Sequence, residues 1–206
     1  MVSDGYYYAA GLLAGAAAVT YLAGWPYAAP FYILALFCLN FFRDPERQAP
    51  EGPFAVAPAD GKVISIQADE SGRQRISIFM NVFDVHVNRT PIPGKIVCIH
   101  YQRGRFLAAD KEEASQENEQ NTITVEGVVG GRRTQVTFKQ IAGLIARRII
   151  CYKRVGDVLG PAERVGLIKF GSRVDVWFGP EWEIAVKMGE RVSAGSSVLA
   201  RILPEA

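Results

Sequence analysis

Residues 165–175 read Val165-Gly166-Leu167-Ile168-Lys169-Phe170-Gly171-Ser172-Arg173-Val174-Asp175. Two apolar runs with the composition of β-strands lie on either side of a Gly-Ser bond. Glycine offers an unhindered carbonyl and a backbone that accepts a tight turn. The neighbouring serine supplies a hydroxyl that becomes a nucleophile once a base takes its proton. The pair therefore fits a bond at which a chain cuts itself, although a Gly-Ser pair alone is far more often an ordinary turn.

The sequence after Phe54 is a succession of short runs that are rich in β-branched residues and separated by turn residues. Strands are expected at 62–66, 75–79, 95–99, 167–170, 174–178, 183–186 and 197–203, and a hairpin is expected to join 121–129 to 132–140 across Gly130-Gly131. Residues 141–151 fit a buried strand or a short helix, and residues 110–119 read as a solvated polar loop. The pattern predicts a mainly β fold, a small barrel-like β-sandwich over residues 54–206.

The first 42 residues have a different character, because Tyr6 to Gly24 and Tyr27 to Phe42 contain no charged residue. A membrane span needs about 20 apolar residues, which the first segment nearly reaches and the second does not. The Trp25-Pro26 pair separates the two segments, so we expect a hydrophobic helical hairpin with Trp25 near a membrane interface. Two full spans and a monotopic anchor in one leaflet both fit this pattern.

The charged residues around the hairpin indicate how it is oriented. Arg43-Asp44-Pro45-Glu46-Arg47 ends the apolar stretch, and no basic residue precedes Tyr6. A secretory signal peptide is disfavoured because it begins with a basic region. The arginines are expected to stay on the cytoplasmic side. We therefore expect residues 1–47 to anchor the chain in the cell membrane, with the β domain on the cytoplasmic side.

Charge, cysteine and histidine content exclude several classes of protein. The net charge is only +2, so no nucleic-acid partner is expected. Cys38, Cys98 and Cys151 are odd in number and lack the spacing of a metal site, so we expect no metal and read them as reduced thiols in apolar surroundings. Only His86 and His100 are available for histidine chemistry.

Three further motifs accompany the Gly171-Ser172 bond. They are Pro58-Ala59-Asp60-Gly61, Val85-His86-Val87-Asn88-Arg89 and Glu117-Asn118-Glu119. Each has an ordinary structural explanation when it is taken alone: a turn, a packed histidine and a polar loop. Their combination in one chain with an apolar hairpin and a Gly-Ser bond is much more specific.

Together these motifs resemble the short-form phosphatidylserine decarboxylase proenzymes, a pyruvoyl-dependent family, over nearly the whole chain. The resemblance is carried, in order, by Phe41-Phe42-Arg43-Asp44-Pro45-Glu46-Arg47, Pro58-Ala59-Asp60-Gly61, Val85-His86-Val87-Asn88-Arg89, Glu117-Asn118-Glu119, Arg147-Arg148-Ile149 and Phe170-Gly171-Ser172-Arg173-Val174-Asp175. It implies self-cleavage at Gly171-Ser172 by Asp60, His86 and Ser172. The products are a β chain of residues 1–171 and an α chain of residues 172–206 that begins with a pyruvoyl group formed from Ser172.

The implied reaction converts phosphatidylserine into phosphatidylethanolamine and CO2. In the implied self-cleavage His86 is the better base, because an unperturbed histidine titrates near neutral pH. Asp60 is then expected to hold the imidazole ring in one tautomer, as in serine-hydrolase triads. The apolar hairpin fits a lipid substrate and a bilayer as partners.

Two departures from longer bacterial members leave one role open. Their cleavage motif is typically Leu-Gly-Ser-Thr, whereas this chain has Phe170-Gly171-Ser172-Arg173, and Phe83 stands where they tend to carry a second histidine. The donor of the proton after decarboxylation is therefore not assigned.

Several alternatives stay open at this stage. A membrane-anchored serine hydrolase would use the same Ser172 and His86, an archaetidylserine decarboxylase is a close variant, and a non-enzymatic adaptor leaves both residues unexplained. Cleavage at Gly195-Ser196 is disfavoured, because the short product could not supply several strands. The sequence leaves a homo-oligomer open.

Overall fold

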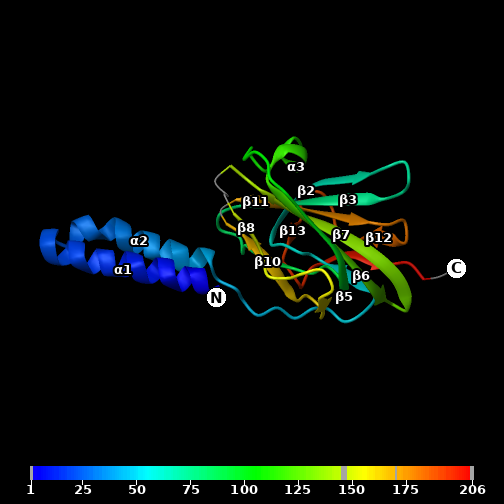
Figure 1. Cartoon of the computed structure of the whole chain (residues 1–206), viewed down its shortest axis with the longest axis horizontal. Coiled ribbons are helices and arrows are strands. Elements are labelled where there is room, and N and C mark those ends of the chain that lie inside the picture. The colour runs from blue at the N-terminus through cyan, green and yellow to red at the C-terminus, as the bar shows by residue number, and fades with distance from the viewer. Residues whose placement is uncertain (1, 145–147, 170, 205–206) are drawn as a thin grey trace. The chain divides into compact units, whose positions relative to one another are not determined.

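The structure, a computed structural model, describes residues 2–144, 148–169 and 171–204 (Figure 1). The chain divides into two compact units, residues 1–46 and residues 47–206. Phe170 and Arg147, which belong to motifs quoted above, lie outside the described residues.

The N-terminal unit is the expected pair of helices. Helix α1 (Ser3–Ala23) and helix α2 (Trp25–Phe41) lie side by side and are joined at Gly24, whose φ of +98° is in a region that favours glycine (Figure 1). Small buried residues, including Ala9 and Ala28, let the two backbones approach closely. In the part of the chain that the structure describes, no helix is both long enough and apolar enough to cross a membrane.

The second unit is built on one curled antiparallel sheet and two smaller sheets (Figure 1). The large sheet has the order β13 (Arg191–Val192), β2 (Gly61–Ala68), β3 (Gln74–Met80), β11 (Ser172–Phe178), β7 (Arg132–Ala142), β6 (Gln120–Val129), β5 (Gly94–Gln102) and β9 (Val158–Leu159). One small sheet has the order β1 (Phe54–Val56), β14 (Val198–Ile202), β12 (Trp182–Ile184). The other small sheet has the order β4 (Val87–Arg89), β10 (Arg164–Ile168), β8 (Ile149–Cys151). The prediction of a mainly β, barrel-like fold with an N-terminal helical hairpin is confirmed.

Strand β11 lies in the interior of the large sheet and positions the site. It pairs with β3 on one edge and β7 on the other, with no bulge in either register. Val174, Val176 and Phe178 belong to the hydrophobic core. Arg173 and Asp175 alternate with them and are also buried, so the strand has almost no exposed surface.

Most of the predicted strands form close to the predicted bounds, and the exceptions are informative. Gly130 and Gly131 both have positive φ, as a two-residue hairpin turn requires, and they join β6 to β7 as predicted. Residues 141–151 begin as the end of β7 and finish as β8, so the strand alternative was right at both ends. Residues 145–147 lie outside the described residues.

Two environments differ from the predictions. The segment expected to be a solvated loop contains a short helix, α3 (Ala114–Glu117), whose Ala114 and Ser115 are buried because the segment covers the large sheet. All three cysteines are free, but Cys98 is exposed because its side chain lies on the solvent face of β5. The expectation of apolar surroundings is therefore wrong for Cys98.

The core of the sheet can be tested at Phe138, which has no exposed surface and lies opposite Val176 of β11. Phe138→Ala should lower the free energy of unfolding by about 3–5 kcal/mol, because it removes buried surface and leaves a cavity. Val128→Ala on β6, where the side chain is 60% exposed, should change it by less than about 0.5 kcal/mol. Urea unfolding followed by tryptophan fluorescence measures both, and equal midpoints would contradict the assigned core.

Candidate active site

The Gly171-Ser172 bond lies where the chain enters β11. Ser172 is the first residue of that strand, pairs with Met80 and Ala142, and has no exposed surface. Gly171 has a φ of +63°, a conformation that side-chain-bearing residues rarely adopt. An added Cβ on Gly143 would lie 2.3 Å from the Gly171 carbonyl oxygen, so this carbonyl packs directly against the Gly143 backbone. The bond is therefore held in a turn whose geometry depends on two glycines.

His86 contacts the backbone of Gly171 from the loop that precedes β4. The ring is fully buried, and its Nδ1 lies 2.9 Å from the carbonyl oxygen of Asp84. Because a carbonyl only accepts hydrogen bonds, Nδ1 carries the proton. The other nitrogen, Nε2, accepts a hydrogen bond from the Gly171 amide at 3.2 Å. The neutral ring thus presents its basic nitrogen to the backbone of Gly171, the residue whose carbonyl forms the bond that the sequence singled out.

The Ser172 hydroxyl has a weak partner. Its Oγ donates to the Met80 thioether sulfur at 3.3 Å, and a thioether is a poor acceptor. The amide of Asn88 lies 3.9 Å from the same sulfur. The Oδ1 of Asn88 accepts a hydrogen bond from Gln140 at 2.9 Å, and the side chain of Gln140 accepts one from Asn121 at 3.0 Å. A buried chain of amides therefore supports the sulfur that faces the serine.

Asp60 forms contacts with Arg47 and with a backbone amide that the sequence did not indicate. Its Oδ2 forms an ion pair with Arg47 at 2.8 Å, and its Oδ1 accepts the Ala194 amide at 2.7 Å. The tautomer-holding contact expected from Asp60 is made in this structure by the Asp84 carbonyl. The carboxyl group of Asp60 therefore ties together two loops at the edge of the domain.

The turn that carries the Asp84 carbonyl was missed by sequence reasoning. The Asp84 carboxylate accepts the Asn81 amide at 2.9 Å, Asn81 Oδ1 accepts the Phe83 amide at 2.8 Å, and Arg191 pairs with Asp84. Asparagine and aspartate characteristically stabilise turns through such side-chain contacts. Asn81 and Asp84, five and two residues before His86, were therefore a usable sequence signal for this turn.

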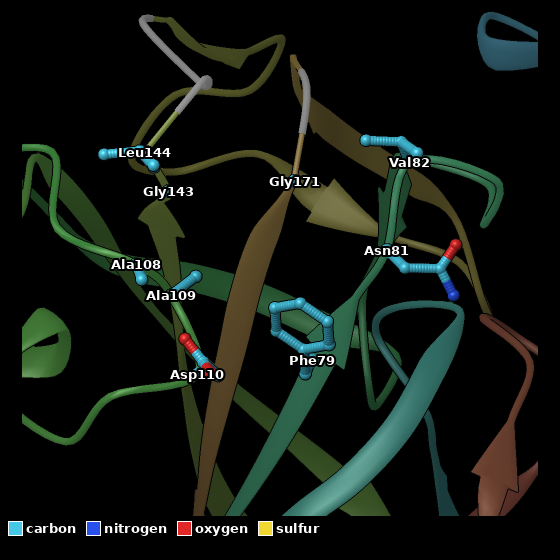
Figure 2. Close-up of a pocket in the computed structure, with 9 residues that line it drawn as sticks. All are labelled: Phe79, Asn81, Val82, Ala108, Ala109, Asp110, Gly143, Leu144 and Gly171. Atoms are coloured by element: carbon cyan, nitrogen blue, oxygen red, sulfur yellow. The ribbon is translucent and has the colours of Figure 1, made fainter.

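A cavity of about 320 Å³ opens beside Gly171. It is lined by Phe79, Asn81, Val82, Ala108, Ala109, Asp110, Gly143, Leu144 and Gly171. Figure 2 shows the Phe79 ring between Asp110 and Asn81, with Leu144 and Val82 on opposite sides of Gly171. The wall is mainly apolar, and Asp110 and Asn81 are its polar side chains among the described residues.

Asn118 explains one of the sequence motifs in structural terms. Its Oδ1 accepts the Leu107 amide at 2.8 Å, and its Nδ2 donates to the Leu107 carbonyl at 2.9 Å and to the Ala142 carbonyl at 2.7 Å. Ala142 is the β7 partner of Ser172. The buried Asn118 therefore joins Leu107, directly before the cavity-lining Ala108, to the strand beside the serine.

Comparison with known proteins agrees with this site. A family profile described as phosphatidylserine decarboxylase matches residues 34–200. The phosphatidylserine decarboxylase proenzyme of Solibacter usitatus is 60% identical over 203 residues, covering 98% of this chain and 97% of the relative. The proenzyme of Cupriavidus pinatubonensis is 46% identical over 200 residues, with 92% and 91% covered, and that of Magnetococcus marinus is 44% identical over 212 residues, with 98% and 95% covered.

The fold, the Gly-Ser bond at the start of β11 and these similarities define a decarboxylase that is made as a proenzyme. The chain belongs to the phosphatidylserine decarboxylase family. The predicted resemblance and enzyme class are thereby confirmed, and the comparisons do not support the serine hydrolase alternative.

The contact between His86 and the Gly171 amide gives a direct test. His86→Ala should slow self-cleavage by about 10²–10⁴-fold, the usual contribution of a general base. His100→Ala is the matched control, because His100 is an exposed residue of β5. The fraction of cut chain is followed over time on a denaturing gel. If the His86 variant were cut faster than the His100 variant, the assignment of His86 as the base would be wrong.

Proposed function

We propose that the protein cuts itself between Gly171 and Ser172 and then uses a pyruvoyl group formed from Ser172 to decarboxylate phosphatidylserine. The observation that carries this proposal is the buried His86 Nε2, 3.2 Å from the amide nitrogen of Gly171 at the edge of the cavity. The products of cleavage are a β chain of residues 1–171 and an α chain of residues 172–206.

Self-cleavage begins with activation of the Ser172 hydroxyl. In this step, rotation about the serine Cα–Cβ bond exchanges the weak contact with Met80 for one with His86 Nε2, which releases the Gly171 amide and takes the serine proton. The freed oxygen attacks the Gly171 carbonyl carbon, and the Ser172 nitrogen takes up a proton as the peptide becomes an ester. Removal of the Ser172 α-proton then expels the Gly171 carboxylate. Hydrolysis of the remaining dehydroalanine releases ammonia and leaves the pyruvoyl group.

Residue 172 is well placed to carry such a group. It is the first residue of a strand held on both edges, and its neighbour Gly171 lines the cavity. A pyruvoyl carbonyl supplies an electrophile that condenses with the substrate amine and accepts electron density as CO2 leaves. The β11 ladder keeps residue 172 in place, so the protein contributes orientation and exclusion of water.

The cavity wall fits the serine headgroup of phosphatidylserine, the lipid in the names of the relatives. Asp110 can pair with the headgroup ammonium, and the Asn81 amide can bind a headgroup oxygen. The remainder of the wall is apolar and includes Phe79 and Leu144, so it offers no competing polar partner to the headgroup. Figure 2 shows Asp110 and Asn81 on opposite sides of the Phe79 ring.

A membrane-anchoring role for residues 1–47 is supported by the surface of the helical unit. Large apolar or aromatic side chains are exposed where α1 meets α2, including Tyr21 at 90%, Leu22 at 80% and Trp25 at 72%. Amphipathic aromatic rings favour the interface between water and lipid. This unit is proposed to hold the decarboxylase at the cytoplasmic face of the cell membrane, where its substrate is concentrated.

The nucleophile is tested with Ser172→Ala. This variant should stay uncut and inactive, because no hydroxyl remains to attack the Gly171 carbonyl. Ser196→Ala, in the turn of the rival Gly195-Ser196 pair, should still be cut. Intact-mass spectrometry distinguishes cut from uncut chains in both variants. A processed Ser172→Ala chain would contradict the assignment of Ser172 as the nucleophile.

The helical unit is tested by deleting residues 1–42, which leaves the Arg47–Asp60 ion pair in place. Self-cleavage should persist, because Gly171, Ser172 and His86 all belong to the second unit. Decarboxylation of phosphatidylserine in vesicles should fall sharply, while activity on a dispersed short-chain lipid should fall much less. Equal activity of the full-length and shortened proteins on vesicles would show that the helices do not bring the enzyme to its substrate.

A further inference from the structure

Arg173, the residue immediately after the cleavage point, is buried to an unusual degree. Its side chain is 1% exposed and Asp175, two positions along the same strand, is fully buried. Burying charged groups is unfavourable unless they are paired and fully hydrogen-bonded. The partners of Arg173 therefore show what this buried residue contributes.

On the strand side, Arg173 is held by two neighbours. Its Nε donates to Asp175 Oδ1 at 2.5 Å, and its Nη2 donates to Ser77 Oγ at 2.8 Å. Ser77 is the β3 residue that pairs with Asp175. These contacts fix the guanidinium against the outer face of the sheet, on the opposite face from the core residue Val174.

The other partners belong to residues 107–117, which we call the covering segment. Arg173 Nη1 donates to the Lys111 carbonyl at 3.2 Å, and Nη2 donates to Glu112 Oε2 at 3.2 Å. Ser115 Oγ donates to Asp175 Oδ2 at 2.7 Å. The covering segment is thus attached to β11 through both members of the buried ion pair.

Two groups at the edge of this network have shifted pKa values that agree with the contacts. Burial by itself would raise the pKa of Glu112, but hydrogen bonds from Arg75 and Arg173 outweigh it and lower the pKa. Burial lowers the pKa of Lys139, and the charge of Asp175 opposes this effect. The Lys139 ammonium donates to the Ser115 carbonyl at 3.1 Å. The covering segment is therefore held by the charged groups of Arg173, at Glu112, and of Lys139, at the Ser115 carbonyl.

The covering segment also forms part of the cavity, because Ala108, Ala109 and Asp110 line it directly before Lys111. We propose that Arg173 is a positioning residue that fixes this wall of the substrate cavity to the strand that begins with residue 172. The inference rests on the proposed function. Self-cleavage removes the covalent link between residues 171 and 172. The contacts of Arg173 with Ser77, Lys111 and Glu112 then join the α chain to the β chain.

Arginine suits this role better than lysine does. The guanidinium is a planar group with five donors, so it binds several acceptors in fixed directions at once. A lysine ammonium at position 173 can pair with Asp175 but cannot also reach Ser77 and the covering segment. Arg173→Lys therefore keeps the buried charge balanced while it releases the wall.

The decisive variant changes only the covering segment. Glu112→Gln combined with Ser115→Ala removes the ion pairs of Glu112 with Arg75 and Arg173 and the hydrogen bond from Ser115 to Asp175, and it leaves the sequence of strand β11 unaltered. The matched control is Glu113→Gln, which changes the same charge at an adjacent exposed residue. The double variant should cut itself to completion. It should raise KM for a dispersed short-chain phosphatidylserine about tenfold, with kcat changed less than about twofold, as expected for lost charged hydrogen bonds outside the reacting atoms.

Proteolysis supplies a second readout that does not depend on activity. Tryptic cleavage after Lys111 should be about tenfold faster in the double variant and in Arg173→Lys than in the Glu113→Gln control, because the same contacts hold the segment closed. The same acceleration is expected when the double variant is combined with Ser172→Ala, which stays uncut.

Failure of the inference and failure of the proposed function give different results. Values of KM and tryptic rate at the level of the Glu113→Gln control would overturn the role of Arg173, and so would a loss confined to the rate of self-cleavage. Processing of the Ser172→Ala chain would overturn the proposed function and leave the tryptic comparison intact.

Discussion

Pairing of strand β11 on both edges is the constraint on which the rest of the structure depends. The ladders with β3 and β7 place Ser172 between Met80 and Ala142, and they alternate core residues with Arg173 and Asp175. Because the strand is buried on both faces, each of its polar side chains needs a hydrogen-bond or ionic partner. Met80 meets the serine on one side, and the covering segment meets the ion pair on the other.

The site is assembled largely from backbone groups and uncharged side chains. The Asp84 carbonyl fixes the tautomer of His86, and the Gly143 backbone packs against the Gly171 carbonyl. Backbone groups on short turns hold their positions without the cost of ordering long side chains. A buried neutral histidine also avoids the desolvation cost of a charged base in the resting proenzyme.

Particular residues show where sequence reasoning succeeded and failed. His86, Gly171 and Ser172 were predicted as site residues from local motifs, and the structure places the His86 ring against the Gly171 amide. Asp60 forms an ion pair with Arg47, which the sequence did not indicate, and its expected role beside the imidazole stays a prediction. The covering segment was read as a solvated loop because its composition is polar, yet its Ser115 is buried against Asp175.

The sequence by itself determined the mainly β class, the helical hairpin, the Gly130-Gly131 turn and the family of the chain. Those features depend on local periodicity, turn chemistry and short motifs, which neighbouring residues specify. Only the tertiary structure decided which carbonyl orients His86, what faces the Ser172 hydroxyl and why Arg173 is buried. These contacts join residues far apart in the chain, such as Arg173 and Ser77, and strand register rather than composition decides which side chains meet.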